Sequence, residues 1–139
     1  MRGQVATENL LPSEQYGLGG FDTVRGYKER EINFDDIIIY NFEIYLPYIS
    51  FSKLLGKSKK PIDKLEFLGF IDAGYGWENN HAAGITKSKG MYSIGPGVRY
   101  SIAPYLTCKL DWGFQLESLG SAGLGGPHQR IHFSAIAGF

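Results

Sequence analysis

The chain lacks several patterns that would assign it to common protein classes. It holds a single cysteine among 139 residues, Cys108, which excludes an internal disulfide and the paired spacing of a zinc cluster. No stretch comes near the ~20 consecutive apolar residues that a transmembrane helix needs, so a helical membrane protein is excluded. Residues 1–15 also lack the apolar centre of a signal peptide.

Charge is balanced rather than concentrated in one sign. Lys and Arg total 14, Asp and Glu total 14, and the formal net charge at pH 7 is zero. The cationic residues do not form a stripe that could neutralise a series of phosphates. We interpret the one basic cluster as a solvated loop; it contains Lys53, Lys57, Lys59 and Lys60. The sequence therefore predicts no nucleic-acid partner.

Groups that could carry chemistry are scattered. The three histidines show no recurring ligand spacing, and no nucleophile–base pair or phosphate-binding loop is present. Glu43 and Glu66 could be read as a glycosidase pair, but we interpret them as acids that line a pore. Glu31, Asp35 and Asp36 could suggest a metal cluster, but we expect these acids to be solvated at the start of a strand. We predict no enzymatic activity, no metal and no cofactor.

What the chain does contain is a period of two that recurs five times. Apolar residues alternate with polar residues or glycine, each time over about the ~9–11 residues that a tilted membrane strand requires. In the clearest run, Leu110, Trp112 and Phe114 share one face while Lys109 and Asp111 share the other. Alternation of this length predicts long β-strands, at residues 38–48, 65–77, 91–101, 105–117 and 130–139.

Two architectures produce such alternation: a soluble antiparallel sheet and a membrane barrel with a wet lumen. The predicted strands exceed the usual soluble length of ~5–6 residues, which favours the barrel. Connections also alternate between short (101–104) and long (78–89 and 118–128), with 49–63 as a long exception. Aromatic residues lie near the ends of the apolar faces, as in membrane girdles; these are Tyr40, Tyr48, Tyr75, Trp77, Tyr92 and Tyr100. We predict an all-β fold, an antiparallel meander of about five long strands belonging to a transmembrane β-barrel.

Three motifs occur in order along the chain. Residues 18–27 read LGGFDTVRGY, and this run resembles the GG-x-x-[ST]-VRG-[YF] segment of the outer-membrane assembly and two-partner-secretion superfamily. The matching positions are Gly19, Gly20, Val24, Arg25, Gly26 and Tyr27. The superfamily's F-x-D-x-G motif is similar to the run that contains Phe70, Asp72 and Gly74. The end of the chain, with Phe133 and a final Phe139, looks like the membrane-insertion signal of barrel proteins. The motifs occur in the expected order over about residues 14–139.

Within that superfamily, two details resemble the two-partner-secretion translocators of the haemolysin-activator and filamentous-haemagglutinin transporter type. They are residues 25–29 followed by 33–36 and Glu43, and the ending at 130–134. The resemblance implies a bacterial outer-membrane protein that secretes a large exoprotein through its barrel. Implied partners are the exoprotein, outer-membrane lipid and, during insertion, the barrel-assembly machinery. Two alternatives stay open: a factor that inserts other barrels, and a soluble β-sheet binding module.

The family's barrel has more strands and carries periplasmic domains, so the resemblance implies that residues 1–139 are a C-terminal fragment. It would contain a lumen loop at 14–35 and five strands at 36–139. The family's loop folds back into the lumen, which implies a contact between Arg25 and Asp72. The alternation separately places Asp72 on the polar face of its strand.

The residue types suit that contact. An arginine fork can hold a carboxylate through two hydrogen bonds. Gly19 and Gly20 would supply positive φ angles where the loop turns. Gly74 would leave room for the loop, and Tyr27 would pack its ring against the inner wall.

Overall fold

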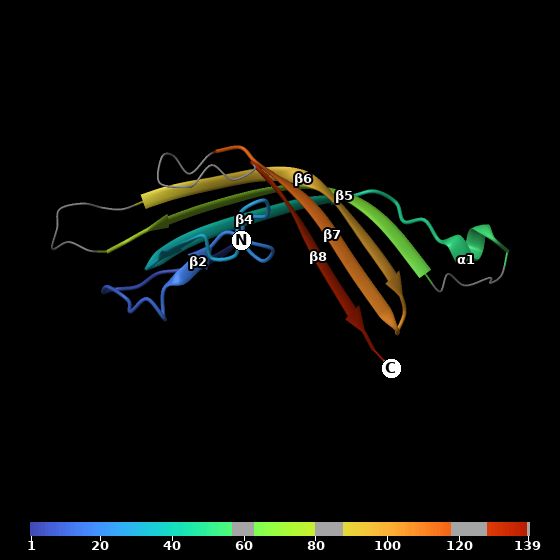
Figure 1. Ribbon diagram of the computed structural model, residues 1–139, viewed down its shortest axis with the longest axis horizontal. Helices are drawn as coiled ribbons and strands as arrows, with labels where there is room; N and C mark the ends of the chain where they lie inside the picture. Colours follow the sequence, from blue (N-terminus) through green and yellow to red (C-terminus); the bar gives the residue numbers. More distant parts are fainter. Residues whose placement is uncertain (57–62, 80–87, 118–127, 139) are drawn as a thin grey trace.

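The computed structural model describes residues 1–56, 63–79, 88–117 and 128–138, and most of them belong to one open, curved β-sheet (Figure 1). Its order is β1-β4-β5-β6-β7-β8, with antiparallel neighbours throughout. The predicted all-β antiparallel meander is confirmed, with short β1 as an addition. The sheet does not close, so β1 and β8 are its edges. The bounds are β1 (Arg2–Gln4), β4 (Asp36–Tyr45), β5 (Asp63–Trp77), β6 (Ser88–Ile102), β7 (Leu106–Gln115) and β8 (Gln129–Ala137).

The first long strand ends earlier than its apolar alternation suggests. β4 stops at Tyr45, two residues before Pro47, which has no amide hydrogen to donate to a ladder. Pairing with β5 resumes at Ile49, whose backbone exchanges two hydrogen bonds of 2.8 Å with Leu65. The one-turn helix α1 (Phe51–Leu54) follows, so part of the long connection at 49–63 is structured. The connections at 78–89 and 118–128 lie mostly outside the described residues.

The two faces of the sheet differ as the alternation predicts. Along β5, Phe67 and Ile71 are exposed on the convex face, while Leu68, Phe70 and Asp72 are buried on the concave face. The same division holds in β7, where Leu110 and Trp112 are exposed and Asp111 is buried. No helix in the described ranges is long and apolar enough to cross a membrane.

The connection between β1 and β4, residues 5–35, folds against the concave face (Figure 1). It carries the antiparallel hairpin of β2 (Tyr16–Leu18) and β3 (Ile32–Phe34). A single apolar cluster forms between this connection and the sheet, and each large side chain in it contributes about 1.5–3 kcal/mol by leaving water. Its buried members are Leu18, Val24, Tyr27, Phe34, Ile37, Ile39 and Met91.

Glycines on the concave face let the connection approach closely. A Cβ atom built on Gly74 would lie 2.6 Å from Leu18 Cδ1 and 2.8 Å from Val24 Cγ2. A Cβ on Gly76 would collide with the ring of Phe34. The room expected at Gly74 is therefore present, and Gly76 extends it along the strand.

Candidate functional site

Three glycines shape the tip of the connection, where the chain reverses direction. Gly19 and Gly20 have φ angles of +105° and +109°, and Gly26 has +94°, a region that other residues rarely adopt. The turn is closed locally, because the amide of Gly19 donates to Thr23 Oγ1 at 2.9 Å. The positive φ angles predicted at Gly19 and Gly20 are confirmed. This turn presents residues 24–27 to the sheet.

Arg25 extends from the tip onto Asp72 of β5. Its Nε donates to Asp72 Oδ2 at 2.7 Å, and its Nη2 donates to Asp72 Oδ1 at 2.8 Å. The backbone amide of Arg25 donates to the same carboxylate at 3.0 Å. Both side chains are buried, with 5% and 0% exposure. The expected contact is thus present, as a two-pronged ion pair that orients the arginine as well as neutralising it.

Further groups complete the surroundings of Arg25. Its Nη1 donates to Glu43 at 2.5 Å and to Asp111 at 3.3 Å, and its guanidinium lies 3.6 Å from the ring centroid of Phe70. Burial disfavours the charge of Arg25, but the hydrogen bonds and negative charge of Asp72, with those of the other two acids, outweigh it. The pKa of Arg25 is therefore raised, and the group is permanently charged.

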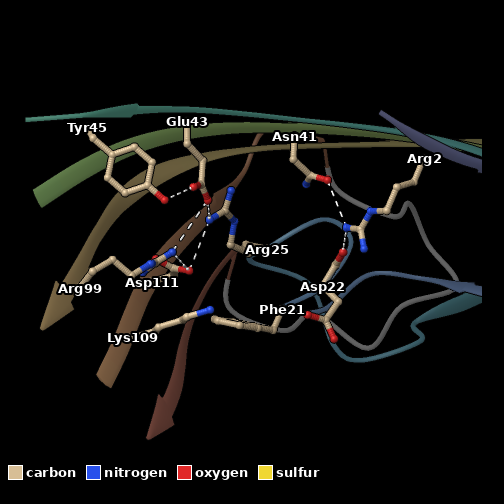
Figure 2. Close-up of a pocket in the computed structure, with 10 residues that line it drawn as sticks. All are labelled: Arg2, Phe21, Asp22, Arg25, Asn41, Glu43, Tyr45, Arg99, Lys109 and Asp111. Carbon is tan, nitrogen blue, oxygen red and sulfur yellow. Dashed lines mark hydrogen bonds and ion pairs between the residues drawn. The ribbon is translucent and has the colours of Figure 1, made fainter. Parts of the chain in front are cut away.

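A second arginine, Arg99 of β6, joins the same network. It donates to both oxygens of Asp111, from Nη1 at 2.5 Å and from Nη2 at 2.9 Å, and its Nη2 lies 3.8 Å from Glu43 (Figure 2). The carboxylate of Asp111 sits where a Cβ on Gly97 would otherwise lie. Because β6 and β7 pair Gly97 directly with Asp111, glycine at this position gives the acid its space.

The residues after Arg25 contact the last two strands. The amide of Gly26 donates to His132 Nε2 at 3.1 Å, and Gln115 Nε2 donates to the carbonyl of Gly26 at 2.7 Å. Because Nε2 accepts this hydrogen bond, it carries no proton here. Gly26 also lies directly against Gly113, whose Cβ would be 2.5 Å from the Gly26 nitrogen. The tip is therefore fastened to β5, β7 and β8 together.

Tyr27 is fully buried against the sheet. Its hydroxyl donates to the carbonyl oxygens of Glu117 at 2.7 Å and Tyr92 at 3.1 Å. Burial raises the pKa of this hydroxyl. Tyr27 is thus a neutral donor that connects the tip to the backbone at the β6–β7 border, which agrees with the packing expected for its ring.

The expectation that Asp35 and Asp36 are solvated is wrong. Both are buried with 2% exposure, and they accept backbone hydrogen bonds that organise the connection. Asp35 accepts from the amides of Asn79 and Leu10 at 2.9 and 3.1 Å, and Asp36 accepts from that of Ala6. Burial opposes the charge of Asp35, but the donors, including Gln15, prevail and lower its pKa. Sequence spacing gave no sign of these partners, which come from distant segments.

A polar cavity of 230 Å³ lies beside the arginine network (Figure 2). Residues of the connection form one side of it and residues of four strands form the rest. The lining is Arg2, Phe21, Asp22, Arg25, Asn41, Glu43, Tyr45, Arg99, Lys109 and Asp111. Within the described part of the chain, no group of three or more His, Cys, Asp or Glu side chains could hold a metal ion.

The predicted site residues therefore fall into two groups. The motif around residues 18–27 and the motif with Phe70, Asp72 and Gly74 come together on the concave face. Phe133 stands apart, 67% exposed on the convex face of β8, and Phe139 lies outside the described residues. Sequence reasoning did not assign Arg99, Asp111 or His132 to the site; the available signal was their position on the polar faces of the alternating runs.

Comparison with known proteins identifies the family. Residues 1–135 match the Omp85 superfamily domain. No curated protein and no solved structure matches the chain. Proteins of this superfamily translocate or assemble proteins at the outer membrane; they are transporters and assembly factors rather than enzymes. Because the match spans nearly the whole sequence, the chain belongs to the Omp85 superfamily.

Proposed function

We propose that this chain is part of an outer-membrane pore that secretes a large exoprotein, in the manner of two-partner-secretion translocators. The observation that carries the proposal is the buried Arg25–Asp72 pair, which holds a long connection against the concave wall. In a pore the concave wall faces the lumen, so residues 14–35 would occupy the space through which an exoprotein passes. Passage therefore requires that the loop at 14–35 be held aside or released.

The residues around the loop suit such a role. An unfolded polypeptide crossing the pore would meet a polar wall that includes Glu43, Arg99 and Lys109 beside the loop. The sequence carries no nucleotide-binding motif, and we infer that nucleotide hydrolysis does not drive transport. On the convex face, exposed side chains such as Ile71 and Trp112 would contact lipid.

A second candidate function is insertion of other barrels into the outer membrane, since the superfamily includes assembly factors as well as transporters. The resemblance of residues 25–29 and 130–134 to secretion translocators favours the first. Deletion of the gene separates the two. A secretion pore predicts that one large exoprotein disappears from the medium while other barrel proteins keep their levels. An assembly factor predicts a broad fall in barrel proteins.

The role of the ion pair is tested by Arg25→Glu, followed by the amount of exoprotein in the medium. Removing one partner from a buried pair typically costs about 3–5 kcal/mol, and here the substitution also places a fourth carboxylate beside Asp72, Glu43 and Asp111. We expect secretion to fall at least tenfold. Lys28→Glu is the matched control, because it makes the same charge change at an exposed position of the same loop. Normal secretion by Arg25→Glu would show that the pair does not hold the loop for transport.

A further inference from the structure

Arg99 and Arg25 lie on different parts of the chain. Arg25 lies on the loop, whereas Arg99 lies on β6 and would stay in the wall if the loop moved. Arg99 holds both oxygens of Asp111 at 2.5 and 2.9 Å, closer than the 3.3 Å contact that Arg25 makes with the same acid. The side chain of Asp111 is 1% exposed, so water does not compensate its charge.

The network holds two cations and three carboxylates. Asp72 is paired chiefly with Arg25, Asp111 chiefly with Arg99, and Glu43 lies within reach of both arginines. If Arg25 left with the loop, Asp72 would lose its ion pair. Asp111 and Glu43 would still face Arg99. Without Arg99, departure of the loop would leave all three acids without a cation from this network.

We propose that Arg99 is a fixed counterion that makes release of the loop reversible by limiting how strongly the three acids hold Arg25. This rests on the proposed function only in requiring that the loop at 14–35 moves. The two arginines bind the same carboxylate oxygen of Asp111, so their like charges lie close together and oppose each other. Arg99 therefore weakens the attraction of the site for Arg25 while keeping Asp111 paired.

The proposal predicts, for each of three variants, whether the loop is held more or less tightly. Arg99→Gln removes the repulsion felt by Arg25 and leaves it facing three acids, so the loop is held more tightly. Asp111→Asn removes an acid that attracts Arg25 and leaves Arg99 with only the more distant Glu43, so the loop is held less tightly. The double variant, with both charges removed, returns close to the original. A purely structural role for Arg99 predicts the opposite result for Arg99→Gln, because losing a packing partner would loosen the loop.

Loop release can be followed through Val24, which is fully buried beside the ion pair. The assay uses Val24→Cys in a Cys108→Ala background, in the outer membrane, with a water-soluble maleimide. Labelling then reports the population in which the loop has left the wall. We expect labelling about tenfold slower in Arg99→Gln and about tenfold faster in Asp111→Asn, a coupling typical of neighbouring charges. Arg99→Lys keeps the charge and should label at nearly the original rate.

Heat-dependent gel mobility checks that each variant is folded. Faster or unchanged labelling in folded Arg99→Gln overturns the proposal. If Arg99→Gln does not fold, Asp111→Asn and the double variant test the proposal instead. The proposal is overturned if Asp111→Asn labels no faster than the original protein, or if the double variant does not return to the original labelling rate. Secretion assays keep this outcome apart from the proposed function. Normal secretion by Arg25→Glu refutes the role of the ion pair in transport. Labelling that is not slowed in Arg99→Gln refutes only the counterion role of Arg99.

Discussion

Replacing Gly113 with alanine tests whether the contact between the loop tip and β7 holds the loop in place. The new Cβ would lie 2.5 Å from the nitrogen of Gly26, and 2.7 Å from the carbonyl carbon of Arg25. Ordinary carbon–nitrogen contacts begin near ~3.4 Å, so the two backbones would have to separate by about 1 Å. Both sides of this contact are backbone, and no flexible side chain can move to relieve it.

A displacement of about 1 Å reaches the hydrogen bonds of the tip. The Gly26 amide is 3.1 Å from His132 Nε2, and the Gly26 carbonyl is 2.7 Å from Gln115 Nε2. Lengthening both by that amount takes each of them beyond hydrogen-bonding distance. Overpacking of this kind costs about 1–3 kcal/mol. A middle value of about 2 kcal/mol corresponds to an exposed loop population about thirtyfold larger.

The assay is maleimide labelling of a cysteine at position 24, compared between Gly113→Ala and Gly69→Ala. Gly69 is a matched control, because it is also a glycine in the middle of a strand and a Cβ there meets no atom within 4 Å. We expect faster labelling only in Gly113→Ala, with both variants folded. Equal labelling of the two variants would refute the close packing of Gly26 on Gly113 as a determinant of loop position.

Two further predictions concern regions away from the arginines. If the exposed ring of Phe133 is part of the insertion signal, Phe133→Ala should lower the amount of protein in the outer membrane severalfold. The measurement is immunoblotting of membrane fractions, with Trp112→Ala as the control. Equal levels of the two variants would count against this role. The lowered pKa of Asp35 means that its contribution to stability is complete above its unfolded pKa of ~3.9 and is lost as pH falls through the lower folded value. Proteolysis of residues 5–15 should therefore accelerate below about pH 4 in the original protein. In Asp35→Asn it should be fast already at neutral pH, and slow cleavage there would contradict this account.

The sequence alone determined the strands and their faces, because a period of two is a local property of each strand. Alternation along β5 and β7 places Asp72 and Asp111 on the same side of the sheet as Glu43. The glycines of the loop motif likewise indicated a turn with positive φ angles. The motif resemblance implied the Arg25–Asp72 contact, because each partner lies within its own recognisable pattern.

Only the tertiary structure decided which polar residues meet. Pairing places Asn41 opposite Asp72, Gly97 opposite Asp111, and Asp111 opposite His132. This register depends on how strands far apart in the sequence align, which no single strand specifies. The same holds for the buried Asp35, whose donors come from residues 10, 15 and 79. A local pattern fixes the face on which a side chain lies, but its partner depends on contacts between distant segments, and those form only when the whole sheet and its loop pack together.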